Sequence, residues 1–523
     1  MQRRTFIMAG AAVLTASRSF RARSQDNPPE SLTALAAALA AGQLSSTALT
    51  QTYLERIARV DRSGPLLKSV IETNPKALEI AAALDAELKS GHSRGPLHGV
   101  PILIKDNIET ADRMMTTAGS LALEGWYSPT DAPLIERLRK AGALILGKTN
   151  LSEWANFRST HAVSGWSARG GQTLNPHALD RSPSGSSSGS AVAVAADLCA
   201  AAVGTETDGS ITSPASINGI VGIKPTVGLV SRRGIAPISH SQDTAGPLAK
   251  SVADAAMLLS ALQGLDANDT ASAALGAQPA QDYARFVDPD GLKGARLGIA
   301  RKFFSDDAPL NAFLDHCVAL LKDAGATIVD PADLPLHGSF GAAEQDVLLY
   351  EFHTDLNAFL GRLKVTQPVR SLEALIQFNE AHKAREMPFF DQELLLQARD
   401  KGPLSEAAYR KARDVCLKAT RTQGIDAVLA EHKLDAMVCL TSGPAWLIDP
   451  INGDADVGSC SSPAAVAGYP HLSVPAGLYR GLPVGLSFFA GALSEGKLIK
   501  LASGFEHVAG TRPIPRFARS ARV

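Results

Sequence analysis

The sequence predicts an α/β protein, and two observations lead to that prediction. Short apolar runs that suit buried strands alternate along the chain with segments of helical periodicity. This alternation is typical of helices packed on a sheet. The chain has 523 residues, of which 45% are hydrophobic and 20% charged, so it can bury a sizeable core.

The first half of the chain carries the clearest alternation. Leu49, Tyr53 and Ile57 are spaced by four and predict a helical segment over residues 31–61. Asn74-Pro75 is typical of an N-cap followed by proline, and it predicts a helix that reaches about Lys89 and stops at Gly91. The other elements predicted here are strands at residues 100–104 and 143–146 and helices at residues 131–141 and 251–262.

The second half begins with a weakly periodic stretch, residues 265–291, which is rich in Ala, Asp, Gln, Gly and Pro and predicts a long surface connection. Beyond it we predict strands at residues 296–300, 327–329, 434–440, 472–474 and 485–489, and helices at residues 310–323, 341–363, 405–432 and 495–508. From position alone, we expect the first half to carry the chemistry and residues 300–430 to shape a pocket.

The N-terminus, residues 1–25, has the pattern of a bacterial export signal. Arg3-Arg4 precedes a short apolar stretch at residues 7–16, and the paired arginines indicate the twin-arginine route. That apolar stretch is too short to span a bilayer. We therefore expect an exported, periplasmic or secreted protein without a membrane anchor in the mature chain. The alternative is a disordered or cytoplasmic N-terminus.

Charge, cysteine and histidine usage exclude several functions. A net charge of -1 provides no basic surface for nucleic acid. The five cysteines are scattered without a C-x-x-C pair, and the twelve histidines include no H-E-x-x-H, so neither a structural zinc site nor a helical zinc protease is indicated. We expect no metal and no cofactor, and we interpret most of the thiols as small core residues.

Residues 181–226 are the unusual part of the chain. Eight of the ten residues at 182–191 are Ser or Gly, an apolar run follows, and a second Gly-rich turn ends at Ser210. Glycine makes such turns costly to order. The usual reason to keep them is that bare backbone N–H groups bind a charged ligand or transition state.

One interpretation of the first turn is a nucleophile elbow. Residues 185–189 match G-x-S-x-G, which would make Ser187 the nucleophile of an α/β-hydrolase. That fold requires a strand directly before the motif, but residues 172–183 are poor in apolar side chains. It also requires a late histidine, and the contexts of His471 and His507 do not suggest one. The surrounding sequence therefore disfavours this interpretation.

A second interpretation combines a lysine with two serines. Lys105 directly follows a buried apolar run, where desolvation lowers the pKa of an amine. An amine that is neutral near pH 7 can act as a general base. Ser186 lies in the first turn and Ser210 in the second. Taken singly, the lysine is more often a surface or salt-bridged residue and each serine a turn residue.

The sequence also resembles the amidase signature family over residues 31–512, and within it bacterial peptide amidases. The resemblance rests on residues 182–190 (SPSGSSSGS), 204–211 (GTETDGSI), 222–226 (GIKPT), 99–107 (GVPILIKDN), 242–247 (QDTAGP) and 467–470 (AGYP), which stand in the family's order. It implies one large domain with a mixed central sheet covered by helices. It also implies hydrolysis of a carboxamide, such as the C-terminal amide of a peptide, to carboxylate and ammonia.

The resemblance further implies a Ser–Ser–Lys triad. Ser210 would be the nucleophile that forms an acyl-enzyme. Ser186, preceded by a cis peptide bond, would link Ser210 to a neutral Lys105. The oxyanion hole would be formed by the backbone N–H groups of one short segment: Thr207, Asp208, Gly209 and Ser210.

Some positions depart from the family's pattern. Ser184, Ser188 and Asp208 stand where glycine is common, and Thr212 stands where many members carry arginine. Asp208 lies within the oxyanion segment, and we keep it there because aspartate tolerates left-handed backbone.

Other functions stay open. They are a fatty-acid or aryl amide hydrolase, the glutaminase subunit of an amidotransferase, and a non-catalytic exported binding protein on this scaffold. We expect an amide substrate, either a small molecule or a peptide, as the partner. The sequence leaves the oligomeric state undetermined.

Overall fold

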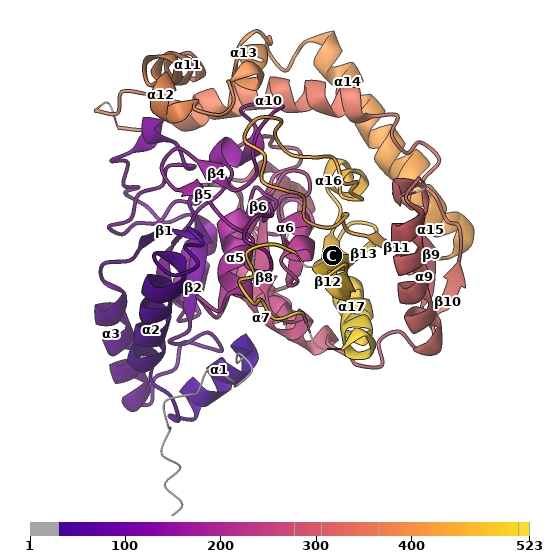
Figure 1. Cartoon of the computed structure of the whole chain (residues 1–523), viewed down its shortest axis with the longest axis horizontal. Coiled ribbons are helices and arrows are strands. Elements are labelled where there is room, and N and C mark those ends of the chain that lie inside the picture. Colours follow the sequence, from indigo (N-terminus) through magenta and orange to yellow (C-terminus); the bar gives the residue numbers. More distant parts are fainter. Residues whose placement is uncertain (1–30, 277, 305, 365, 511, 522–523) are drawn as a thin grey trace, which may run out of the picture. The chain divides into compact units, whose positions relative to one another are not determined.

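A mixed β-sheet with helices packed against it forms the centre of the fold (Figure 1). The computed structural model describes residues 31–276, 278–304, 306–364, 366–510 and 512–521. Within these ranges eleven strands form the main sheet, in the order β1-β3-β2-β6-β8-β7-β12-β13-β11-β9-β10. The export signal predicted for residues 1–25 lies outside the described residues and stays a prediction.

The strands of the main sheet are short and mostly buried. In chain order they are β1 Val70–Thr73, β2 Pro101–Lys105, β3 Leu144–Thr149, β6 Ala201–Glu206, β7 Val221–Lys224, β8 Thr244–Ala249, β9 Arg296–Ile299, β10 Thr327–Val329, β11 Ala436–Leu440, β12 His471–Tyr479 and β13 Leu482–Phe489. A separate antiparallel pair is formed by β4 Trp166–Ser167 and β5 Gly171–Gln172. Every predicted strand is confirmed, although β12 extends beyond its predicted end.

Both strand directions occur in the main sheet. Strand β2 pairs in parallel with β3 and β6, and β9 pairs in parallel with β10 and β11. The pairs β6–β8, β7–β8, β7–β12 and β12–β13 are antiparallel. The sheet is therefore mixed, as the resemblance implied, and the fully buried parallel strands β2, β3, β6 and β11 begin with apolar residues.

Helices flank the sheet. They are α1 Leu32–Ala40, α2 Ser46–Arg56, α3 Ala77–Lys89, α4 Pro133–Lys140, α5 Ser188–Ala195, α6 Thr212–Ile217, α7 Val252–Leu262, α8 Thr270–Leu275, α9 Ala308–Asp323, α10 Gly341–Gly361, α11 Leu372–Ala381, α12 Lys383–Glu386, α13 Glu393–Arg399, α14 Ala407–Leu417, α15 Asp426–His432, α16 Ser462–Ala467 and α17 Glu495–Ala509. Among the helices described, none is long and apolar enough to cross a membrane.

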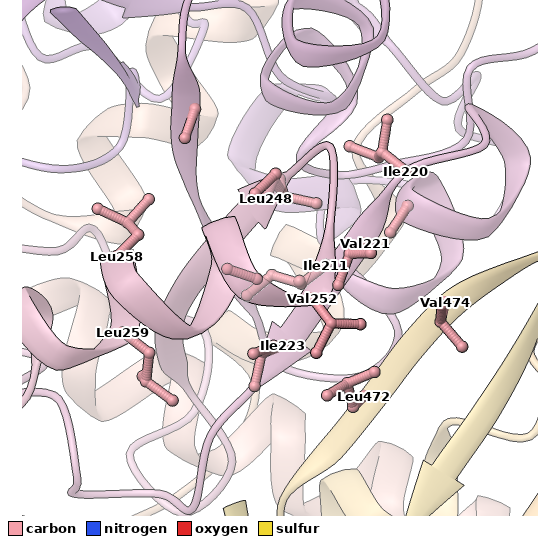
Figure 2. Packing of buried hydrophobic residues seen from close by; sticks show 14 of the residues in the cluster. Ile211, Ile220, Val221, Ile223, Leu248, Val252, Leu258, Leu259, Leu472 and Val474 are labelled. Atoms are coloured by element: carbon pink, nitrogen blue, oxygen red, sulfur yellow. The ribbon is translucent and has the colours of Figure 1, made fainter. Parts of the chain in front are cut away.

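Figure 2 shows the part of the core where α7 packs near the middle strands of the sheet. Strands β7 and β12 are neighbours although they are far apart in the sequence, and Leu472 faces Ile223 in their pairing. The labelled side chains that pack there are all almost fully buried: Ile211, Ile220, Val221, Ile223, Leu248, Val252, Leu258, Leu259, Leu472 and Val474. This junction joins the two halves of the chain in one core.

The predicted helix over residues 31–61 is wrong as one continuous element. It is two helices, α1 and α2, with a break at residues 41–45, followed by a π-helical turn at Ile57–Asp61. Ser45 accepts a hydrogen bond from the backbone N–H of Ala48, at 3.1 Å, and so starts a new helix. The predicted helix over residues 405–432 is likewise divided, because the backbone leaves helical geometry at Gly424, between α14 and α15.

Two smaller predictions also need correction. The helix predicted from Asn74-Pro75 begins at Ala77, because the Asn74 side chain first forms a turn by accepting from the N–H of Lys76. The connection at residues 265–291 contains a short helix, α8, which the weak periodicity did not indicate. All five cysteines lie in the described residues, buried and without a disulfide, as the core interpretation predicts.

Candidate active site

Lys105 is the last residue of β2, in the interior of the sheet. The strand Pro101–Lys105 is buried along its whole length between β3 and β6, and the Lys105 side chain is 0% exposed. Burial disfavours the charged amine and lowers the pKa of Lys105 to about 7, against the opposing pull of the Asp243 and Glu206 carboxylates. The desolvation predicted from the apolar run is confirmed.

The Lys105 amine is surrounded by hydroxyl groups. Its Nζ lies 2.8 Å from Ser186 Oγ, 3.1 Å from Ser187 Oγ and 2.8 Å from Thr205 Oγ1. It also donates to the Thr205 carbonyl at 3.3 Å. The Asn107 side-chain amide donates to Thr205 Oγ1 at 3.0 Å and so fixes that hydroxyl. The neutral form of this amine can accept a proton from a neighbouring hydroxyl.

Ser186 lies in the turn just before α5 and is fully buried. The Gly185–Ser186 peptide bond is cis, as the resemblance implied. The Ser186 carbonyl accepts from the N–H of Ser152, at 3.2 Å. Ser184, one of the departures from glycine, has φ +59, which explains why glycine is common at that position.

Ser210 lies in the second turn, between β6 and α6, and is 8% exposed. Its carbonyl accepts from the N–H of Ser187, at 3.2 Å, so the two Ser/Gly turns are in direct contact. The hydrogen bonds of the described residues do not include one between the hydroxyls of Ser186 and Ser210. The structure thus joins Lys105 directly to Ser186 and places Ser210 against the following residue.

The segment from Thr207 to Ser210 leaves its backbone N–H groups available for a ligand. None of its four N–H groups donates to another described residue. The Glu206 carboxylate accepts from the N–H groups of Ile211 and Thr212, at 2.7 and 2.9 Å, and thereby closes the turn just beyond. Consecutive free N–H groups in a turn of this kind form a binding site for an anion. An oxyanion is one such anion.

The left-handed backbone expected at Asp208 is wrong. The left-handed residue of the turn is Gly209, with φ +77, and Asp208 is not among the residues with positive φ. The Asp208 side chain accepts from the Ser462 hydroxyl, at 2.6 Å. The neighbouring glycine provides the conformational freedom, so an aspartate fits at position 208.

Asp243 is part of the site that sequence reasoning did not single out. It accepts from the Thr207 hydroxyl, at 2.6 Å, and from the backbone N–H groups of Ile238 and Ser239. Burial raises the pKa of Asp243 to about 6. It lies within residues 242–247, one of the segments that resemble the family, and this was the signal by which the sequence could have identified it.

Ser187 contacts Lys105 Nζ, at 3.1 Å, but its hydroxyl is held by the backbone of Thr205. Its hydroxyl donates to the Thr205 carbonyl, at 2.9 Å, and accepts from the Thr205 N–H, at 3.2 Å. Of the late histidines, His471 is buried against Ser487 and His507 is exposed on α17. The α/β-hydrolase interpretation therefore does not fit this geometry.

One cluster among the described residues has the composition of a metal site, namely His240, Glu351 and Asp355. Its groups already have partners. The His240 Nδ1 atom lies 2.8 Å from Asp355 Oδ2, and Glu351 accepts from the hydroxyls of Ser241 and Tyr409. Both carboxylates raise the pKa of His240, against desolvation, so the cluster fits an ion pair better than a metal site.

Comparisons with known proteins agree on one family. The family model described as Amidase matches residues 48–499. The chain is 51% identical to the native peptide amidase from Stenotrophomonas maltophilia, with a TM-score of 0.89, over 93% of this chain and 98% of that one.

Two other relatives are more distant. A probable amidase of Arabidopsis thaliana is 43% identical over 91% of this chain and 89% of its own length. A glutamyl-tRNA(Gln) amidotransferase subunit of Symbiobacterium thermophilum is 36% identical over 90% of this chain and 94% of its own length. The match thus extends over nearly all of the chain and of each relative. The chain belongs to the amidase signature family and is an amidase, a hydrolase of carboxamides.

Proposed function

We propose that Ser210, Ser186 and Lys105 form a catalytic triad that hydrolyses a carboxamide through an acyl-enzyme. The observation that supports this most is the contact of 2.8 Å between Lys105 Nζ and Ser186 Oγ, at a lysine whose pKa is lowered to about 7. A buried lysine that titrates near pH 7 and touches a serine hydroxyl fits a general base.

In the first step the Ser210 oxygen attacks the amide carbon. The Ser210 proton moves to Ser186, and the Ser186 proton moves to Lys105. The carbonyl oxygen becomes an anion, which accepts hydrogen bonds from the N–H groups of Thr207, Asp208, Gly209 and Ser210. The transfer from Ser210 requires its hydroxyl to turn toward Ser186, and catalytic hydrogen bonds commonly tighten only when substrate binds.

In the second step the carbon–nitrogen bond breaks. Ser186 gives a proton to the leaving nitrogen and recovers one from Lys105, so ammonia departs and an ester remains on Ser210. Water then attacks the ester, with its proton passing along the same two groups. The carboxylic acid is released and Ser210 regains its proton, so atoms and charge balance over the cycle.

We propose a peptide C-terminal amide as the substrate class. The 51% identity to a protein named as a peptide amidase supports this choice. The relative named as part of an amidotransferase shares less, at 36%. Glutamine, fatty amides and aryl amides are therefore the competing substrates, and a comparison of turnover among them distinguishes the possibilities.

The test is ammonia release by purified protein from an N-acylated dipeptide amide, compared with glutamine, a fatty amide and an aryl amide at equal concentration. We expect the dipeptide amide to have the highest kcat/KM. Ser210→Ala should abolish turnover. The matched control is Ser190→Ala, because Ser190 is a buried serine of the same region whose hydroxyl bonds to Thr149 and Val203 instead of the triad.

Two results would contradict the proposal. Unchanged turnover in Ser210→Ala would remove the nucleophile assignment. Equal loss in Ser190→Ala and Ser210→Ala would show that the effect is general to buried serines of this region. Preference for another amide class would leave the triad in place and replace the substrate.

A further inference from the structure

A pair of acidic side chains meets on the far side of the oxyanion segment. Asp208 belongs to that segment, and Glu344 lies in the first turn of α10. The two carboxyl groups are close enough for each to shift the pKa of the other. The Asp208 Oδ1 atom is buried and has no donor among the described hydrogen bonds, and Ser462 donates to the other oxygen of Asp208, at 2.6 Å. The Ser461 hydroxyl also acts on the Asp208 carboxyl group, and a proton shared with Glu344 gives Oδ1 a further donor.

Glu344 also reaches the same segment by a second route. Its Oε1 atom accepts from the Gln242 side-chain amide, at 3.0 Å. The same amide group donates to the Thr207 carbonyl, at 3.3 Å. Glu344 therefore contacts residue 208 directly and residue 207 through one intermediate.

Two further acidic residues of α10 hold the neighbouring loop, residues 238–243. Glu351 accepts from the Ser241 N–H and hydroxyl, at 3.1 and 2.8 Å, and Asp355 accepts from the His240 N–H, at 3.0 Å. This loop ends in Asp243, which accepts from the Thr207 hydroxyl. One helix thus anchors both the oxyanion segment and the loop that supports it.

We propose that Glu344 is a positioning residue for the amidase reaction: by sharing a proton with Asp208 and by holding Gln242, it sets the backbone of Thr207–Ser210 in the geometry that receives the oxyanion. The inference rests on the proposed function, because it assumes that these N–H groups bind the oxyanion. Glu344 touches neither the substrate carbonyl nor the triad in this assignment.

Burial of the two neighbouring carboxyl groups disfavours the state in which both are ionised. Burial and mutual repulsion raise the pKa of both Asp208 and Glu344, and the Ser461 and Ser462 hydroxyls partly oppose the shift at Asp208. Two carboxyl groups in contact cannot both be ionised cheaply, so sharing one proton is the favoured state of the pair. Loss of that proton places two negative charges side by side and pushes Asp208 away from α10.

Few other charged or titratable groups face the pair. They are Glu206 from β6, Lys224 from β7 and the Cys416 thiol from α14, with Asp243 beyond Thr207. Helix α16 contributes the Ser462 hydroxyl and no charge. Lys224 is itself buried, with its pKa lowered to about 8, so it provides only part of a compensating charge.

The first measurement is a split of kcat and KM, on the full chain with an N-acylated dipeptide amide. We expect Glu344→Ala to lower kcat about 100-fold, the effect of losing about one oxyanion donor, while KM changes less than about threefold. The matched control is Asp346→Ala, two residues along α10, whose carboxylate pairs with Lys401 at the surface. This control should keep kcat within about twofold. Equal kcat in Glu344→Ala and the control would overturn the proposal.

The second measurement uses Glu344→Gln, which keeps the size and a permanent donor to Asp208. We expect this variant to recover kcat to within about fivefold of the parent at neutral pH, and to lack the alkaline fall in kcat that deprotonation of the pair causes in the parent. If kcat changes with pH in the same way in the parent and in Glu344→Gln above neutral pH, the proposal is overturned. This test holds even if Glu344→Ala fails to fold.

The two proposals fail in different ways. If Ser210→Ala keeps its turnover, the triad and the oxyanion assignment fail together. If Ser210→Ala is inactive and the Glu344 variants behave like Asp346→Ala, the triad stands and only the positioning role is lost.

Discussion

Two buried lysines on adjacent strands, Lys105 on β2 and Lys148 on β3, have the same exposure and different surroundings. Both side chains are 0% exposed, and burial lowers the pKa of both. Lys148 pairs across the strands with Ile104. Because side chains alternate between the faces of a sheet, Lys148 and Lys105 lie on opposite faces.

The partners of the two amines differ. Lys148 Nζ donates to the Ile108 carbonyl, at 2.6 Å, and to the Thr116 hydroxyl, at 2.9 Å. Carboxylates that favour its charged form surround it, namely Asp106, Asp112, Glu72 and Glu109. Lys105 has three hydroxyls in contact instead. Burial alone therefore does not make a lysine a general base. The lysine also needs neighbouring hydroxyl groups that can pass a proton to it.

The largest expected effect separates the two lysines by turnover. Lys105→Met should lower kcat/KM about 1000-fold or more, in the range of a lost general base. Lys148→Met should keep kcat within about tenfold while its thermal unfolding temperature falls, because it leaves a buried carbonyl and carboxylates without their partner. The measurements are ammonia release and thermal unfolding of both variants. Similar losses of kcat in the two variants would show that the loss of activity follows from removing a buried lysine and not from the hydroxyl partners of Lys105.

The second effect is a fall of kcat/KM at acidic pH. If Lys105 must be neutral, kcat/KM of the parent should fall about tenfold per pH unit below a midpoint near 7, because the lysine has a pKa of about 7 and gains a proton there. A pH–rate profile with the amidated dipeptide measures it. Lys148→Met should keep the same midpoint. A flat profile between pH 5 and 7 would exclude a titrating base in this range.

The smallest effect is on stability. Lys105 has its ordinary pKa of 10.5 when unfolded and about 7 when folded, so the unfolded chain binds one more proton between these values. The free energy of unfolding should rise with pH in that window, by about 1.4 kcal/mol per pH unit from this group. Urea unfolding of the parent and of Lys105→Met at pH 7, 8 and 9 tests it. If the free energy of unfolding changes with pH equally in the parent and in Lys105→Met, the lowered pKa of Lys105 is contradicted.

Much of the fold could be predicted from the sequence, because apolar runs and helical spacing are patterns among neighbouring residues. The strands at residues 100–104 and 434–440 are apolar runs of strand length, and both occur as β2 and β11. The breaks in the long helices could not be predicted. The divisions at residues 41–45 and at Gly424 come from capping and tertiary contacts, which leave the apolar spacing on either side unchanged.

The site was predictable to the extent that it lies in motifs. Lys105 follows a buried run, and the cis bond before Ser186 was expected from the resemblance. Glu344 could not be found, because an acidic residue in the first turn of a helix is ordinary. The role that we propose for it rests on its neighbours Asp208 and Gln242, which both lie far away in the sequence.

The neighbour relation between β7 and β12 has a consequence for how the protein is made. Residues 221–224 are synthesised well before residues 471–473, which pair with them. Until then, one side of β7 offers unpaired backbone groups in the middle of what becomes the sheet, and such edges readily pair with other chains. A chain that lacks residues 471–473 therefore leaves this interior edge of β7 unpaired and open to pairing with other chains.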